Sequence, residues 1–121
     1  MATESGVSFG FVREWIAHEF GGEIETLDGT VSVGVTPTEV AGGDGDRGAL
    51  LMLNLSAATI YVAPNTLVAA TRGIFLGANG GSLALVLRDD LVLPTLQWWA
   101  LAAAAASDLY VLRVRRYRVV P

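Results

Sequence analysis

The chain has 121 residues, 52% of them hydrophobic and 17% charged, and its formal net charge is -4. That length suits one domain, and the hydrophobic share is too high for an intrinsically disordered chain. Cysteine is absent, which excludes disulfide bonds and thiolate metal sites, and the acidic balance argues against a nucleic-acid partner.

Residues 1–28 are predicted to form an arm that contains a short amphipathic helix. Apolar residues recur at helical spacing from Ser8 to Phe20, Ser8 can cap the start, and Gly21-Gly22 can end the helix. So short a helix is not stable alone, so we expect it to contact the β core or a protein partner. The side chains expected at that contact are Phe9, Phe11, Trp15, Ile16 and Phe20. No basic and then apolar leader pattern comes first, so no signal peptide is predicted.

Residues 29–121 are predicted to form a small all-β domain, an antiparallel β-sandwich of jelly-roll type. Apolar and polar side chains alternate along several short segments, and successive side chains of a strand point to opposite faces. The predicted strands are residues 30–36, 50–55, 59–64, 68–71, 73–76, 82–88, 96–102 and 109–119. For residues 91–106 a helix is the alternative, because Ala102–Ala106 favours helix locally. Residues 50–55 are apolar on both faces apart from Asn54, so we expect cover on both sides, by the helix or by a second subunit.

The connections between these strands are rich in turn-forming residues. Residues 38–48 are rich in glycine and aspartate and are predicted to form a mobile loop. Asn79-Gly80 predicts a hairpin, because both residues accept positive φ. Ser107-Asp108 is predicted to turn the chain into its last strand.

The last predicted strand concentrates the positive charge of the chain. Its arginines are Arg113, Arg115, Arg116 and Arg118. Tyr110, Leu112 and Val114 share one face, whereas Tyr117 and Val119 have the other parity. A one-residue bulge at Arg115-Arg116 would bring all five onto the core face and leave the arginines outside.

Charge is divided unevenly along the chain. Residues 1–46 carry nine acids and one arginine, a balance of -8, whereas residues 47–121 carry seven arginines and three acids, a balance of +4. The arginine-rich strand is interpreted either as a solvated face or as a surface that meets the acidic half, in the same subunit or the next. The acids considered as its partners are Glu19, Glu23, Glu25 and Asp28.

No constellation of catalytic or metal-ligating residues accompanies the strands, so we expect no enzymatic activity, no cofactor and no metal. His18 is the only histidine, and residues 42–46 lack the spacing of a calcium loop. Trp98-Trp99 could offer a sugar platform, but one of two neighbouring strand side chains must face the core. Residues 91–107 are uncharged, but Pro94 interrupts them and no membrane span is expected.

Residues 47–119 resemble a small β-sandwich module that recurs in the virion proteins of tailed bacteriophages. The resembling pieces are Leu53–Ser56, Ala58–Pro64, Gly73–Leu76 with the glycine-rich turn at 77–81, Ser82–Leu87 and Ser107–Leu112. Such modules occur in head decoration proteins, fibre bases and tail proteins, and they are structural rather than enzymatic.

The resemblance implies a bacteriophage virion protein, first of all a capsid decoration or cement protein that stabilises the shell through contacts between subunits. Its implied partners are copies of itself, with a trimer preferred by analogy, and a major capsid protein or another virion protein. Its implied location is the virion, assembled in the host cytoplasm. A tail or fibre subunit is the near alternative, and a carbohydrate- or ligand-binding β-sandwich module is the alternative from another functional class.

Overall fold

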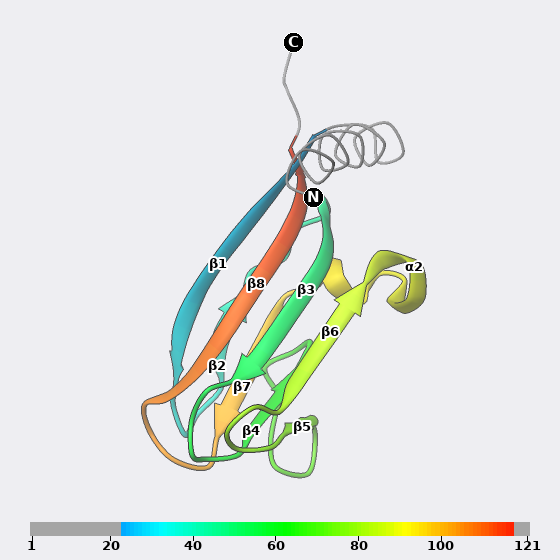
Figure 1. The fold of residues 1–121 in the computed structure, drawn as a ribbon. Coiled ribbons are helices and arrows are strands. Elements are labelled where there is room, and N and C mark those ends of the chain that lie inside the picture. The colour runs from blue at the N-terminus through cyan, green and yellow to red at the C-terminus, as the bar shows by residue number, and fades with distance from the viewer. Residues whose placement is uncertain (1–22, 118–121) are drawn as a thin grey trace, which may run out of the picture.

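The computed structural model describes residues 23–117 as two β-sheets packed face to face (Figure 1). The strands are β1 (Glu23–Val33), β2 (Thr38–Ala41), β3 (Arg47–Asn54), β4 (Ile60–Ala63), β5 (Ile74–Leu76), β6 (Ser82–Val86), β7 (Trp98–Ala102) and β8 (Ser107–Tyr117). Between β6 and β7 lie a short helix, α2 (Leu87–Asp90), and the 3₁₀ turn η1 (Leu93–Thr95). Strands dominate because β-branched and other apolar residues fill segments that glycine, proline and asparagine interrupt every few residues.

The strand order is that of a jelly roll. One sheet has the order β1-β8-β3-β6 and the other β2-β7-β4-β5, and neighbouring strands are antiparallel. Every connection between described strands except β4–β5 carries the chain from one sheet to the other, which winds the strands into a double-layered sandwich. The prediction of an all-β sandwich is confirmed. The predicted N-terminal helix lies outside the described residues.

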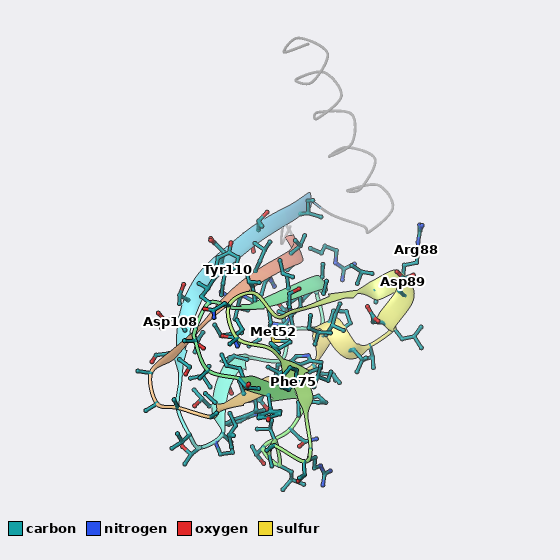
Figure 2. All side chains as sticks on the ribbon, turned by 60° about the horizontal axis from the view of Figure 1, so that its bottom comes forward. Met52, Phe75, Arg88, Asp89, Asp108 and Tyr110 are labelled. Carbon is teal, nitrogen blue, oxygen red and sulfur yellow. The ribbon has the colours of Figure 1, made fainter. Side chains whose placement is uncertain are left out.

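The core lies between the two sheets and follows the two-residue alternation of the strands. In β3, Leu50 and Met52 are buried, whereas Leu51 and Leu53 are half-buried on the outer face. Figure 2 shows Met52 in the middle of this inner layer. Trp98 of β7 is buried as well, and its indole N–H donates to a carbonyl of η1 at 2.9 Å. Among the described residues, full cover is therefore present on one face of β3, and cover of the other face by the helix or by a second subunit stays a prediction.

Asn54, the polar residue within the apolar run of β3, is fully buried and hydrogen-bonded. Its amide nitrogen donates to the carbonyls of Ala58, Leu76 and Gly77 at 2.8, 3.0 and 3.1 Å. Its side-chain oxygen accepts from the backbone N–H and the hydroxyl of Ser56 at 2.8 and 2.7 Å. Because a buried polar group is costly without its partners, Asn54 fixes the loop after β3 against the end of β5.

β1 and β2 differ from their predicted positions. β1 begins at Glu23, well before the predicted strand at residues 30–36, so the boundary predicted between residues 28 and 29 falls inside it. The loop predicted at residues 38–48 contains β2 and the first residues of β3. Polar side chains along β1 and glycines beside β2 obscure the alternation, and backbone pairing with β8 and β7 makes both segments strands.

The turn predicted at Asn79-Gly80 is present but joins different strands. Both residues have positive φ, 56° and 125°. They lead from β5 in one sheet to β6 in the other and form no hairpin. The N–H groups of Asn79 and Gly80 donate to the carbonyls of Ser56 and Asn54, both at 2.8 Å. The loop after β3, rather than a paired strand, therefore holds this turn.

Other short segments also differ from the prediction. The strand predicted at residues 68–71 is reduced to a bridge between Ala69 and Arg72, and residues 87–88 belong to α2 rather than to β6. The turn before the last strand is made by residues 103–106, and Ser107-Asp108 already belongs to β8. In the part of the chain that the structure describes, no helix is long and apolar enough to cross a membrane.

β8 turns the opposite set of side chains to the core from the predicted one. Leu109 and Val111 are buried, 0% and 2% exposed, whereas Tyr110 and Leu112 are half-buried on the outer face. The bulge predicted at Arg115-Arg116 is absent, since β1 pairs with β8 without interruption, and a register shift lies instead in the first residues of β3. Apolar residues occupy both faces here, so the pattern does not tell the two faces apart.

Candidate functional site

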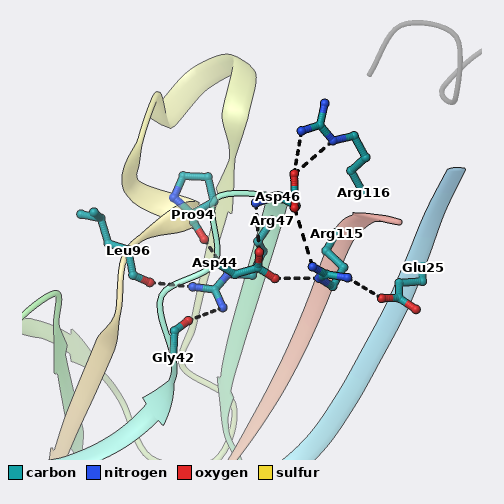
Figure 3. A network of polar contacts seen from close by, with 9 residues as sticks. All are labelled: Glu25, Gly42, Asp44, Asp46, Arg47, Pro94, Leu96, Arg115 and Arg116. Carbon is teal, nitrogen blue, oxygen red and sulfur yellow. Dashed lines mark hydrogen bonds and ion pairs between the residues drawn. The ribbon is translucent and has the colours of Figure 1, made fainter. Parts of the chain in front are cut away.

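Charged side chains gather at the end of the sandwich where β8 ends, and there they form an ion-pair network (Figure 3). Arg115 pairs through Nη1 with Glu25 Oε1 at 2.8 Å and through Nε with Asp44 Oδ2 at 2.7 Å. Arg116 pairs through Nη2 with Asp46 Oδ1 at 2.6 Å, and Asp46 also lies 3.9 Å from Arg115. The arginine-rich strand therefore meets the acidic half of the chain within one subunit, whereas a contact across a subunit boundary stays a prediction.

The loop between β2 and β3 presents Asp44 and Asp46 in a turn of its own. The N–H of Asp46 donates to Asp44 Oδ1 at 2.9 Å, which is the local bond that aspartate favours in turns. The N–H of Arg116 donates to the carbonyl of Asp46 at 2.7 Å and attaches the loop to β8. Sequence reasoning missed both aspartates because it assigned residues 38–48 to a mobile loop. The sequence carries no signal that would have paired them with β8, because the two segments lie far apart along the chain.

Arg47, at the start of β3, is 3% exposed and connects separate segments. Its Nε and Nη2 donate to the carbonyls of Pro94 and Leu96, both at 2.6 Å, and its Nη1 donates to the carbonyl of Gly42 at 2.8 Å. Burial lowers the pKa of Arg47, and Asp44 acts in the opposite direction. Arginine stays charged nonetheless, because its ordinary pKa lies above about 12. The side chain holds the β2–β3 loop against the segment that leads into β7.

The network also keeps Asp44 ionised. The hydrogen bond from Arg115 lowers the pKa of Asp44 below its ordinary value of 3.8, although burial acts the other way. Hydrogen bonds to Asp44 and Glu25 raise the pKa of Arg115. Because these side chains are partly exposed, water and salt screen their attraction. The pairs therefore act mainly to position the loop.

A groove of about 640 Å³ lies beside the network, on the outer face of β1-β8-β3-β6. Val114, Ala49 and Val86 stand in one row across β8, β3 and β6 and form an apolar floor, and Ile24 lines the groove from β1. Arg88 of α2 also lines it. The same face carries further half-buried apolar side chains beyond the groove, namely Tyr110, Leu112, Leu51 and Leu53.

The outer side of β2-β7-β4-β5 carries a second apolar surface, formed by Trp99, Leu101, Tyr61 and Phe75, which we call the aromatic face. Tyr61 lies between Leu101 and Phe75 in one cross-strand row. The rings of Tyr61 and Phe75 meet edge to face, 5.9 Å apart and inclined by 70°. Trp98 faces the core and Trp99 the outer side, which confirms that one ring of this pair is committed to the interior.

Of the predicted interface residues, only some of those in β8 lie in the described part of the chain. Arg115 and Arg116 belong to the ion-pair network. Arg113 follows Leu109 and Val111 on the inner side of its sheet, and its Nε is buried without a hydrogen-bond partner among the described residues. Outside the described residues lie Phe9, Phe11, Trp15, Ile16, Phe20 and Arg118.

The acids considered as partners of this strand have different roles. Glu25 pairs with Arg115 as predicted. Asp28 instead accepts a hydrogen bond from the Tyr110 hydroxyl at 3.0 Å, which raises the pKa of Tyr110. Among the described residues, no three His, Cys, Asp or Glu side chains gather where they could hold a metal ion.

No protein-family model and no curated protein sequence matches the chain. Among solved structures of similar fold is one from Bacillus endospore appendages, which form a family of disulfide-linked pili, with a TM-score of 0.47 and 14% identity over 79% of this chain and 88% of that chain. Another is dTDP-4-dehydrorhamnose 3,5-epimerase from Bacillus anthracis, with a TM-score of 0.42 and 11% identity. That match covers 87% of this chain but only 61% of the epimerase. The Tobacco streak virus coat protein has a TM-score of 0.36 and 9% identity over 79% of this chain and 90% of the coat protein. These likenesses concern the fold alone.

Proposed function

We propose that the chain is a non-enzymatic structural subunit that assembles with copies of itself, in the first place as a capsid decoration protein of a tailed bacteriophage. The observation that carries this proposal is the aromatic face. It presents large apolar side chains on the outer side of a sheet, and Phe75 has 63% of its surface exposed. Monomeric soluble proteins seldom leave a contiguous apolar surface of this kind uncovered.

Covering the aromatic face with a second subunit would stabilise the assembly. Taking a large apolar side chain out of water contributes roughly 1.5–3 kcal/mol, and aromatic residues are enriched at the centres of protein interfaces. The four side chains lie on strands that the core already holds in place, so little conformational freedom is lost when a partner covers them. We propose a homo-oligomer, and a trimer in particular by analogy with phage decoration proteins.

Capsid decoration is the specific form of this role. Jelly-roll sandwiches build viral shells among other structures, but one fold serves many functions. This step therefore rests on the resemblance of residues 47–119 to phage virion modules. Because the shell would bind only the folded subunit, the contact would stabilise the folded, bound subunit by mass action. Its partner would be a major capsid protein or another virion protein, and its location the virion.

Two alternatives use the same surface. A tail or fibre subunit would cover the aromatic face in the same way, and the copy number in purified particles separates the two virion roles. Many copies per particle indicate a shell protein, and a few indicate a tail or fibre. A carbohydrate-binding module is favoured by Trp99 and Tyr61 at the surface, although Tyr61 and Phe75 are inclined by 70° and form no flat platform. Absence of the chain from particles, together with glycan binding that Trp99→Ala removes, would support the module instead.

Sedimentation velocity of the purified chain tests the assembly. We expect oligomers at micromolar concentration for the wild type and monomers for Phe75→Glu, because an unpaired carboxylate is costly to bury. Val92→Glu is the matched control, since Val92 is 58% exposed and lies between α2 and η1, outside the aromatic face. A monomeric wild type, or equal dissociation of both variants, would contradict the proposal.

A further inference from the structure

We propose that the groove on the outer face of β1-β8-β3-β6 binds residues 9–20 of the same chain, docked as the amphipathic helix that the sequence predicts. This contact is independent of assembly through the aromatic face, which lies on the other sheet. Four observations support the docking of residues 9–20: the apolar floor of the groove, its place beside the start of β1, the span of the sheet from β1 to β6, and the charge along the groove.

The floor of the groove suits the apolar side of a helix. Ala49 stands between Val114 and Val86 in one cross-strand row, so the row dips at its middle and can receive a larger side chain. The groove volume of about 640 Å³ falls within the range of about 300–1,000 Å³ that is typical of sites for sizeable ligands. Residues 9–20 offer four aromatic side chains, and an amphipathic helix in an apolar groove is a recurrent mode of recognition.

The C-terminal end of residues 9–20 is followed closely by β1, which borders the groove, and the segment is long enough to cross the sheet. Ile24, the second residue of β1, lines the groove, so the described fold begins at the β1 side of the groove. Neighbouring strands lie about 4.8 Å apart, so the three steps from β1 to β6 span about 14 Å. A helix of twelve residues is about 18 Å long. Residues 9–20 would therefore reach from β1 across β8 and β3 to β6 and α2.

The charge along the groove is complementary to that of the segment. Arg88 extends from α2 away from the sandwich (Figure 2) and forms no ion pair with any described residue. Residues 1–22 carry three acids and one arginine, a balance of -2. Two of these acids, Glu14 and Glu19, lie within the docking segment. They would meet the guanidinium group of Arg88 once the segment lies in the groove.

The tether favours the chain's own segment over that of a second copy. Gly21-Gly22 supplies the backbone freedom for the sharp turn between a segment that crosses the strands and the start of β1. A short flexible tether holds its segment at an effective concentration in the millimolar range, so a second copy at micromolar concentration is at a disadvantage of about a thousandfold.

Engineered cysteines test the proposal in the full chain, which has no cysteine of its own. Ile16→Cys together with Val114→Cys should form an intramolecular disulfide under mild oxidation. In the proposed docking, residue 16 lies four residues, about 6 Å, from residue 20 and therefore above β8, and the bond requires Cβ atoms about 4 Å apart. The product is a monomer on a non-reducing gel, without free thiols. The control pair, Ile16→Cys with Ala104→Cys, places the second thiol in the exposed turn at the other end of β8 and should stay largely reduced.

Two outcomes of this experiment would overturn the proposal. A covalent dimer that forms when the single variants Ile16→Cys and Val114→Cys are mixed would show that a second copy occupies the groove. Cross-linking no greater than in the control pair would show that residues 9–20 do not occupy it at all. Neither result bears on the aromatic face, whose test is the oligomeric state of Phe75→Glu.

Hydrogen exchange of the full chain gives a second, independent measurement. Backbone amides of residues 12–20 should be protected in the wild type, and Arg88→Glu should lower this protection by up to about fivefold, the range of an exposed ion pair. Arg72→Glu, an exposed charge reversal between β4 and β5, is the matched control and should leave the protection unchanged. Unprotected amides in the wild type, or equal effects of both variants, would overturn the proposal.

Discussion

Arg47 and Asn54 are buried polar residues that hold loops to the sandwich. Each donates hydrogen bonds to backbone carbonyls of segments that are distant in the sequence. Loops cannot satisfy their carbonyls by strand pairing, so a side chain supplies the missing donors. Neither role could be predicted from the sequence. An arginine after a glycine-rich loop and an asparagine in an apolar strand carry no distinctive pattern, and their acceptors are fixed only by the folded chain.

Replacing Arg47 should be among the most destabilising single changes. Arg47→Ala removes the donor from three carbonyls at a site where the side chain is 3% exposed. We expect the free energy of unfolding to fall by at least about 3 kcal/mol, the usual result of leaving buried partners of a charged group unsatisfied. Urea unfolding at neutral pH measures the change. Arg72→Ala, at an exposed position, should stay within about 0.5 kcal/mol of the wild type. If Arg47→Ala lost no more stability than Arg72→Ala, water would have to replace the guanidinium group as the hydrogen-bond donor.

The ion-pair network should make stability depend on acid in a defined direction. Pairing with Arg115 lowers the pKa of Asp44 below 3.8, so the folded state binds this proton less tightly than the unfolded chain does. The contribution of Asp44 is therefore present above the unfolded pKa of about 3.9 and is lost as the pH falls through the lowered value. Asp44→Asn should be less stable than the wild type at neutral pH, and the difference should shrink under acid conditions. Urea unfolding across this range tests it, and parallel pH profiles would contradict it.

At the scale of elements, the alternation of apolar and polar residues predicts the strands that have an apolar inner face. It misses segments without that alternation, which become strands by pairing with an adjacent strand. The predictions at residues 50–55, 59–64, 82–88 and 96–102 each overlap an observed strand, namely β3, β4, β6 and β7. The strand predicted at residues 30–36 overlaps the end of β1. The first part of β1 and the whole of β2 became evident only from their pairing with β8 and β7. The turn at Asn79-Gly80 shows the same limit. Its backbone conformation follows from local chemistry, whereas the sheet that it leads to is decided by packing.

The candidate site was predictable to a similar extent. The cluster of arginines on the last strand and the pairing of Arg115 with Glu25 follow from charge and position. Asp44 and Asp46 could not be assigned, because a glycine-rich segment gives no sign that β8 will bind it. The aromatic face depends on cross-strand register, which joins residues from β4, β5 and β7. A sequence pattern within one strand does not contain that register.

A pair of leucines tests which side of β8 faces the core. Leu109 is 0% exposed, whereas Leu112 is half-buried on the outer face. Leu109→Ala should cost about 2–5 kcal/mol because it leaves a cavity in the core. Leu112→Ala removes the same atoms from a surface that can collapse or hydrate, so it should cost less than half as much. Thermal or urea unfolding of the two variants compares them. The reverse order would show that the inner and outer faces are exchanged.

At the scale of the whole molecule, the sandwich is apolar outside as well as inside. The groove lies on one sheet and the aromatic face on the other. With 52% hydrophobic residues in the chain, two exterior surfaces remain to be covered after the core is built. If residues 9–20 cover the groove and a partner covers the aromatic face, each subunit has one sheet covered by its own chain and one sheet that is available for assembly. Such a subunit would form limited contacts rather than aggregate through both sheets.

The pairing of β1 with β8 also determines where this chain can be cut and rejoined. Glu23 lies opposite Tyr117 in that pair, and opposed residues of antiparallel strands are only about 4.5–5.5 Å apart. A short linker from residue 117 to residue 23, with new ends opened between residues 104 and 105 in the exposed turn before β8, would give a circular permutant with every strand neighbour retained. The permutant lacks residues 1–22 and 118–121, so its reference is the linear fragment of residues 23–117. We expect its circular dichroism spectrum and its amide chemical shifts, away from the junctions, to match those of that fragment. An unfolded permutant would show that the β7–β8 connection must be continuous, whereas a folded one would make strand adjacency, and not the order of strands along the chain, the property that specifies this sandwich.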